Sequence, residues 1–315
     1  MAVTLAQARL NVTDDLQRGI IDEFAKNNYL LDHLTFHDCV SPVGGGGTLT
    51  YAYTRLITQP TAAFRKVNAE YTPSEVKKQR ETVDLKVFGG AFEIDRVIKD
   101  MGGIVDEVQL QASQKVKAAQ ALFNDKVING DSAVNEDEFD GLNVMLTGTN
   151  TEQTTSIDLS TSAAVTSNYM AFMDELDEFL AMLNGRPDAL LMNSKMAAKL
   201  RAVARRAGMY QTTKDNWGNQ IESYGVIPFI DLGAKAGTND DVIATNSGAT
   251  DIYAVRFGMD GFHGISLAGQ APIKMWLPDF STAGAVKKGE VEMVAAVALK
   301  DTRAAGVLRG IKVSA

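Results

Sequence analysis

The feature that most limits the possible folds is a long polar stretch between two alternating segments near the N-terminus. Residues 48–56 (TLTYAYTRL) and 82–88 (TVDLKVF) both place apolar side chains at every second position, as half-buried β-strands do. About 25 residues rich in Thr, Gln, Arg, Lys and Glu separate them, and so long a connection without its own core is unusual inside a compact domain. We therefore expect a projecting β-hairpin over residues 48–98, whose apolar face is covered by another molecule.

Charge sets the same stretch apart from the rest of the chain. The 315 residues include 31 Lys and Arg against 39 Asp and Glu, which gives a net charge of −8. Residues 48–100 instead carry nine basic and seven acidic side chains, and residues 271–315 carry seven and four. An acidic chain lacks the overall excess of Lys and Arg on which nucleic-acid binding depends. These two stretches are therefore basic segments, +2 and +3, within an acidic chain.

The clearest helical pattern covers residues 103–128, and Asn129-Gly130 is a typical C-terminal stop. An acidic loop follows over residues 131–140. Over residues 103–128, apolar side chains recur every three or four positions, which predicts one unusually long amphipathic helix. These side chains are Val105, Val108, Ala112, Val116, Ala119, Phe123 and Val127.

The second half of the chain mixes both kinds of element, so the predicted fold class is α+β. Apolar spacing predicts helices over 168–183 and 194–207, with Ser167 and Ser194 as N-caps, and residues 147–167 are predicted to form a surface loop. Short apolar runs predict strands at 189–192, 226–230, 241–245, 252–257, 264–267, 274–277 and 291–299.

Residues 1–40 are typical of an arm. Leu16, Ile20 and Phe24 recur every four residues, and Gly44 to Gly47 then interrupt the chain. That apolar stripe is too short to form a core, so it needs another surface to pack on.

The chain has few of the residues that catalytic and metal sites use. It has one cysteine, Cys39, and three histidines, and no phosphate-binding glycine loop or nucleophile motif. The only metal-like cluster is His33, His37 and Cys39, on a segment without a core to fix ligand geometry. We therefore expect no catalytic residues, no metal site and no cofactor. A basic cluster on the helix over 194–207 is expected to be solvated or to face a subunit, and its members are Lys195, Lys199, Arg201, Arg205 and Arg206.

Taken in order, these segments resemble the major capsid proteins of tailed phages, which have the Hong Kong 97-type fold that encapsulin shells share. Local patterns that such proteins often show are Asn129-Gly130-Asp131, Phe139-Asp140-Gly141-Leu142, Tyr224 to Pro228 and Tyr253 to Gly258. The resemblance implies an N-terminal arm (1–47), an extended loop or E-loop (48–98), a peripheral domain with a spine helix (99–146), an axial domain (147–270) and returning peripheral strands (271–315).

The resemblance also implies a function. A chain of this kind self-assembles as hexamers and pentamers into an icosahedral shell that encloses double-stranded DNA without sequence-specific binding. The implied partners are a portal protein, a separate scaffolding protein and a decoration protein, and the implied location is the virion, after assembly in the host bacterial cytoplasm and without a membrane. The candidate inter-subunit contacts are Leu16, Ile20, Phe24, Tyr51, Tyr53, Arg55, Arg65, Lys66, Lys77, Lys78 and Arg80.

Two other interpretations stay open. An encapsulin-type compartment has the same fold but encloses cargo enzymes. An enzyme with a site assembled from two subunits, with a metal at His33 and His37, belongs to a different class altogether.

Overall fold

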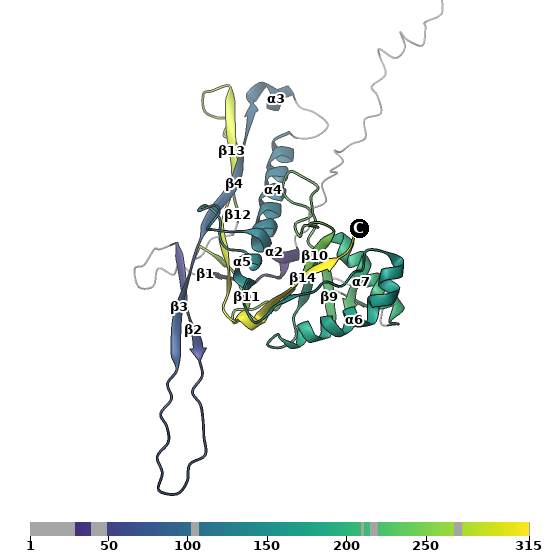
Figure 1. Ribbon diagram of the computed structural model, residues 1–315. Coiled ribbons are helices and arrows are strands. Elements are labelled where there is room, and N and C mark those ends of the chain that lie inside the picture. The colour runs from purple at the N-terminus through teal and green to yellow at the C-terminus, as the bar shows by residue number, and fades with distance from the viewer. Residues whose placement is uncertain are drawn as a thin grey trace, which may run out of the picture.

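The computed structural model describes residues 29–38, 49–101, 107–208, 211–214, 220–267 and 273–314. Figure 1 shows a body from which one thin β-hairpin projects at one end. The long helix α4 lies alongside two long strands toward the other end. In chain order the elements are α2 (Tyr29–His33), β1 (Phe36–Asp38), β2 (Thr50–Thr58), β3 (Lys77–Asp84), β4 (Lys86–Asp95), α3 (Arg96–Met101), α4 (Glu107–Asn129), α5 (Leu142–Leu146), β5 (Glu152–Thr154), α6 (Ser162–Ala181), β6 (Ala189–Met192), α7 (Ser194–Arg206), β7 (Gln211–Lys214), β8 (Gln220–Tyr224), β9 (Ile227–Asp231), β10 (Ala249–Val255), β11 (Phe262–Ser266), β12 (Ile273–Trp276), β13 (Val286–Leu299) and β14 (Ala305–Lys312).

A seven-stranded sheet, in the order β5-β14-β10-β6-β9-β8-β7, lies between two hydrophobic clusters. Along β6, Leu190 and Met192 pack with α6 and α7, while Ala189 and Leu191 pack toward α4 and α5. Successive side chains of a strand point to opposite faces. The continuous apolar run of β6 is explained by burial on both faces, because all four of its residues are buried.

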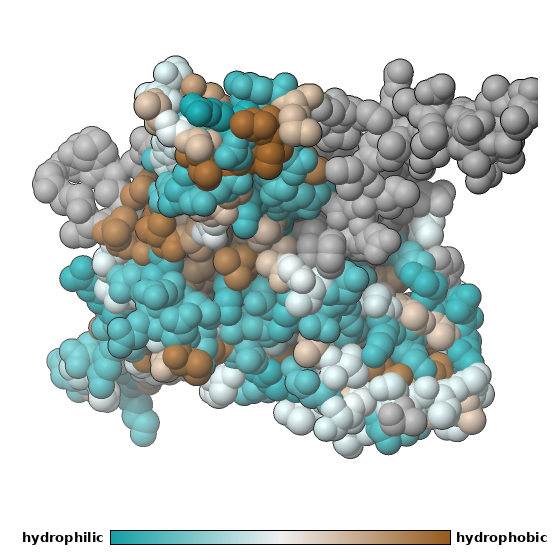
Figure 2. Space-filling model, turned by 90° about the horizontal axis from the view of Figure 1, so that it is seen from above, coloured by the Kyte–Doolittle hydropathy of each residue, from teal (hydrophilic) through white to brown (hydrophobic). Residues whose placement is uncertain are grey.

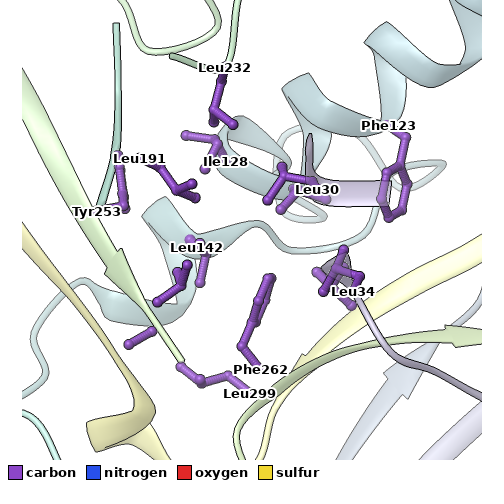
Figure 3. Close-up of a cluster of buried hydrophobic side chains, with 14 of the residues drawn as sticks. Leu30, Leu34, Phe123, Ile128, Leu142, Leu191, Leu232, Tyr253, Phe262 and Leu299 are labelled. Carbon is purple, nitrogen blue, oxygen red and sulfur yellow. The ribbon is translucent and has the colours of Figure 1, made fainter. Parts of the chain in front are cut away.

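A five-stranded sheet is organised around β13. This 14-residue strand pairs with β4 along one edge and with β11 and β12 in succession along the other, all antiparallel, and β1 adds in parallel to β11. Helix α4 covers this sheet, with Ala112 packed against Phe92 and Ile94 of β4, and Figure 3 shows Phe123 and Ile128 of α4 directed into the same cluster as Leu30, Phe262 and Leu299. The helix is about 34 Å long at 1.5 Å per residue.

Two glycines hold the acidic loop over residues 131–140 closed. Gly130 ends α4 by donating to the Lys126 carbonyl at 2.9 Å, and Gly141 donates to the Gly130 carbonyl, also at 2.9 Å. A Cβ atom on Gly130 would lie 2.2 Å from the Phe139 carbonyl oxygen, and one on Gly141 would lie 2.6 Å from that of Lys126. The close backbone approach therefore explains why glycine stands at both ends of this loop.

Several predicted boundaries are wrong. Helix α6 begins at Ser162, with Thr161 rather than Ser167 as its cap, because Val165 extends the buried stripe one turn earlier. Helix α7 is capped by the Asn193 side chain rather than by Ser194. Part of the expected surface loop over 147–167 is thus helix, and another part is the short strand β5.

Residues 241–245 are buried in part but do not form the expected strand. The carbonyl of Val242 accepts from the Asn129 side chain at 2.8 Å, and the carbonyl of Ile243 accepts from the Asn193 side chain at 2.9 Å. Side-chain amides thus satisfy backbone groups that a neighbouring strand would otherwise satisfy.

The alternating segment over 82–88 is also divided. It breaks at Leu85, so that β3 stays in the hairpin and β4 crosses into the five-stranded sheet. Leu85 is buried, whereas Val87 is 54% exposed, so they do not share a face.

Among the described residues, no helix is both long and apolar enough to cross a bilayer.

Candidate assembly surface

The projecting hairpin is the most exposed part of the described chain. Strands β2 and β3 pair antiparallel from Thr50↔Asp84 to Thr58↔Lys77, and residues 59–76 continue beyond them without regular structure (Figure 1). The hairpin nevertheless carries large apolar side chains that its own chain does not cover. These are Leu56, Ile57, Phe64, Val67, Tyr71 and Val76, and all are exposed. Several large apolar side chains left exposed on one projecting element indicate a candidate interaction site.

Local contacts order the tip of the hairpin. A turn closes where Ala69 donates to the Lys66 carbonyl at 3.1 Å, with Asn68 in the left-handed region at φ 67°. The Arg65 guanidinium lies 5.3 Å from the centre of the Tyr71 ring and donates to the Ala69 carbonyl at 3.2 Å. Further back, the Ser74 hydroxyl bonds both backbone groups of Thr61 and joins the two limbs. A partly preformed tip loses less entropy on binding than a disordered one.

The base of the hairpin is anchored to the five-stranded sheet. The Tyr51 ring is buried beside His37, Tyr53 and His263, with ring centres 5.6–5.9 Å away. The Tyr53 hydroxyl donates to the Leu299 carbonyl at 3.0 Å. Burial raises the pKa of the Tyr53 hydroxyl, so it stays protonated and able to donate.

Arg55 ties the hairpin base to the end of β13. Its Nη2 donates to the Leu299 carbonyl at 2.7 Å and its Nε to the Lys300 carbonyl at 3.0 Å. Tyr51, Tyr53 and Arg55 thus make their described contacts within their own chain. That they also contact a neighbouring subunit stays a prediction.

Removing the Arg55 anchor should loosen the hairpin. Arg55→Ala leaves the Lys300 carbonyl without its donor, and we expect the free energy of unfolding to fall by about 1–2 kcal/mol. Thr54 is an exposed neighbour of Arg55 on the opposite face of β2, so Thr54→Ala is the matched control. It should change the free energy of unfolding by less than about 0.5 kcal/mol. Urea denaturation measures both variants, and equal values for the two would show that the anchor contributes nothing.

The other predicted contact residues divide into two groups. Arg65, Lys66, Lys77, Lys78 and Arg80 are exposed on the hairpin, and none forms an ion pair with a described residue. Their role as contacts stays a prediction, and so does that of the arm residues, which lie outside the described residues. The arm residues are Leu16, Ile20 and Phe24.

A second exposed apolar area lies at the opposite end of the molecule, and the sequence patterns did not indicate it. Val97, Ile98 and Met101 of α3 and Val286 of β13 are each more than half exposed. Figure 2, viewed from above, shows hydrophobic side chains in separate patches among hydrophilic ones. The short helix α3 was not expected, because six residues are too few for a clear period.

Several side chains of the remaining polar clusters make contacts within the chain. In the basic cluster on α7, Arg201 pairs with Glu222 at 2.5 Å and Lys199 donates to the Ser160 carbonyl at 2.6 Å. His33 stacks on Tyr29, whereas His37 faces Tyr51. In the described ranges, no group of three or more His, Cys, Asp or Glu side chains lies close enough to hold a metal ion, and Cys39 lies outside those ranges.

His263 should make the fold sensitive to acid. It is fully buried, and burial, assisted by Lys300, lowers its pKa from 6.5 to about 4. The unfolded chain therefore binds a proton at His263 more readily than the folded chain does. The stability that neutral, buried His263 contributes is complete above pH 6.5 and is lost as the pH falls toward 4. We expect the free energy of unfolding to decrease by up to about 3 kcal/mol over that window. Urea denaturation between pH 4 and 7 should show a shallower dependence for His263→Gln, and identical slopes would contradict this assignment.

Comparison with known proteins gives matches in structure alone. No protein-family model matches the sequence, and no curated protein matches it in sequence. The SrpI encapsulin of Synechococcus elongatus PCC 7942 matches with a TM-score of 0.67 and 15% identity, over 100% of this chain and 98% of that chain. A chain of Mycobacterium phage Bobi matches with a TM-score of 0.64 and 14% identity, over 98% and 99%. The capsid of the native GTA particle matches with a TM-score of 0.62 and 15% identity, over 98% and 100%.

These matches extend over essentially the full length of both chains in each pair. Identity of 14–15% establishes the fold and leaves function to be argued separately. The chain therefore has the fold of the encapsulin and of the GTA capsid protein, as the resemblance to Hong Kong 97-type shell proteins predicted.

Proposed function

We propose that this chain is the major capsid protein of a tailed bacteriophage, which self-assembles as hexamers and pentamers into the icosahedral shell around the double-stranded DNA genome. The observation that carries the proposal is the full-length likeness in fold to shell proteins. The projecting hairpin supports it, because its exposed apolar side chains require a neighbour to cover them.

The proposed division into domains follows the resemblance. Residues 1–47 form the arm, 48–98 the extended loop, 99–146 with 271–315 the peripheral domain, and 147–270 the axial domain. Four strands cross these divisions, because β1, β4 and β11 lie in the five-stranded sheet beside the peripheral strands β12 and β13, and β14 lies in the seven-stranded sheet. Interleaved strands of this kind join the two parts firmly.

The proposed partners follow from how such a shell is built. Copies of the chain itself form most contacts. A portal protein, a separate scaffolding protein and a decoration protein complete the set, and the assembled chain is located in the virion after assembly in the host bacterial cytoplasm. We propose no catalytic role.

The test is expression of the chain followed by sedimentation and electron microscopy. Closed shells, rings of five or six subunits, or tubes are the expected products. A stable monomer at high protein concentration would contradict the proposal.

An encapsulin-type compartment is the second candidate, and the TM-score of 0.67 to the SrpI encapsulin favours it. The particle contents distinguish the two. A single small shell size with a cargo peptide bound to the inner wall would identify a compartment, whereas shells that package DNA would identify a capsid. For an enzyme with a site shared between subunits, stoichiometric zinc together with loss of activity in His37→Ala would be required.

A shell that is loaded with DNA should hold it weakly. The net charge of −8 opposes extensive phosphate contacts, so we expect purified capsomers to bind double-stranded DNA with a Kd weaker than about 1 µM at physiological salt. Fluorescence anisotropy with a labelled duplex measures this, and a submicromolar Kd would contradict the expectation.

A further inference from the structure

An open apolar pocket of about 190 Å³ lies where β4, α4 and the acidic loop over residues 131–140 meet. Its apolar lining consists of Val87, Phe88, Leu122, Phe123 and Phe139. Phe88 and Phe123 stack with ring centres 6.1 Å apart, and Phe139 lies 6.0 Å from Phe123. An apolar cavity of about 150 Å³ is large enough to hold a benzene ring, so this pocket has room for one phenyl group.

Phe64 is the most exposed large apolar side chain of the described residues, with its ring fully in solvent at the tip of the hairpin. It cannot reach the pocket of its own chain. The pocket begins at Lys86, next to the hairpin base, and the chain from Thr50 to Phe64 extends away from that base by up to about 45 Å at roughly 3.3 Å per residue (Figure 1). A second copy can bring this pocket to Phe64, whereas its own chain cannot.

The charges beside the two surfaces are complementary. Lys66 is exposed near Phe64 and forms no ion pair with a described residue. At the pocket, Lys126 is paired with Glu138 at 2.7 Å, and Lys86 donates to the Glu136 carbonyl. Asp137 in the pocket lining and Glu136 beside it are exposed and have no ion-pair partner among the described residues, so together with the positive charge of Lys86 they leave a net charge of −1 around the pocket.

We propose that Phe64 of one copy inserts into the pocket between β4, α4 and the acidic loop of a second copy, with Lys66 facing Glu136 and Asp137. This inference rests on the proposed function, because it names the partner surface of the hairpin. The knob and the pocket lie on different parts of the chain, so the contact is heterologous and joins copies head to tail. Closed rings form from such contacts when the rotation between copies closes.

Disulfide trapping tests the contact in the assembled protein. In a Cys39→Ser background, Phe64→Cys chains are mixed with Val87→Cys chains during assembly and then oxidised. We expect a cross-linked dimer in the mixed shells, and none in shells that mix Phe64→Cys with Met170→Cys, an exposed position on α6. Shells that form normally but cross-link equally in both mixtures would overturn this contact and leave the proposed function intact. A wild-type chain that stays monomeric would overturn both.

Assembly yields give a second test that does not depend on cross-linking. Phe64→Ala should lower shell yield at a fixed protein concentration by roughly tenfold or more, as loss of an interface hot spot does, without changing the melting temperature. The control Val67→Ala removes another exposed apolar side chain of the tip and should stay within about twofold of wild type. Lys66→Glu should also lower the yield, and adding Asp137→Lys should restore it. Unchanged yield for Phe64→Ala, or no restoration in the charge-swapped pair, would overturn the proposal.

Discussion

A chain whose residues 59–76 are replaced by Asn-Gly is expected to fold normally and to form no shells. The two-residue turn joins Thr58 to Lys77, which already face each other across the hairpin, and Asn-Gly is the preferred sequence for such a turn. The replaced segment contributes nothing to the buried core, because every residue in it is exposed. The loss falls on assembly, since the tip carries Phe64, Val67 and Tyr71.

Two measurements separate folding from assembly in this variant. Thermal unfolding of the unassembled protein should occur within a few degrees of the unassembled wild-type chain, and analytical ultracentrifugation should detect no particles under conditions in which the wild-type chain assembles. Shells formed in normal yield by the shortened chain would contradict the role given to the hairpin. A large drop in melting temperature would mean that the tip stabilises the subunit itself.

The second large effect is expected in the core. Phe123→Ala should lower the free energy of unfolding by about 3–5 kcal/mol, the usual cost of removing a buried phenyl group. The Phe123 ring is fully buried and contacts the rings of Phe36, Phe88 and Phe139 with centres 6.0–6.1 Å away. These four rings come from β1, α4, β4 and the acidic loop, so one cavity would weaken four segments.

The control for the core variant lies on the same helix. Ser113 is exposed on α4, and Ser113→Ala should change the free energy of unfolding by less than about 0.5 kcal/mol. Urea denaturation of both variants provides the comparison. A cost below about 1 kcal/mol for Phe123→Ala would mean that the rings around it collapse into the space or do not form the core.

Features that a short stretch of sequence determines were predictable. Helix α4 followed from a period maintained over many residues, and the burial of Ala112, Ala119, Phe123 and Val127 confirms the predicted face. The pairing of β2 with β3 likewise followed from alternation on both sides of a polar connection. A repeated pattern identifies the face of an element more reliably than its ends.

Features that depend on contacts between distant segments were not predictable. Asn193, rather than Ser194, caps α7 because its amide also reaches the Ile243 carbonyl on a remote loop. The anchoring of Arg55 depends on two carbonyls at the far end of the chain. Burial of His263 similarly involves the remote strand β2, whose Tyr51 ring lies against it. A pattern read along one segment contains none of this information.

The candidate contact surface shows the same division. Residues on the hairpin were identifiable because a polar stretch that long has no core of its own. The pocket beside Phe123 was not, because it is lined from three separate segments. Exposed side chains on α3 were missed for a related reason, since the helix is too short to produce a period.

Cryo-electron microscopy of the assembled wild-type chain is the sharpest test of the proposed assembly, because it reveals both the particle and the position of the hairpin. We expect closed shells in which β2 and β3 of each subunit lie across the body of the next and bury the tip residue Phe64 against it. A chain that stays monomeric at high concentration, or shells in which the hairpin extends free into solvent, would contradict it.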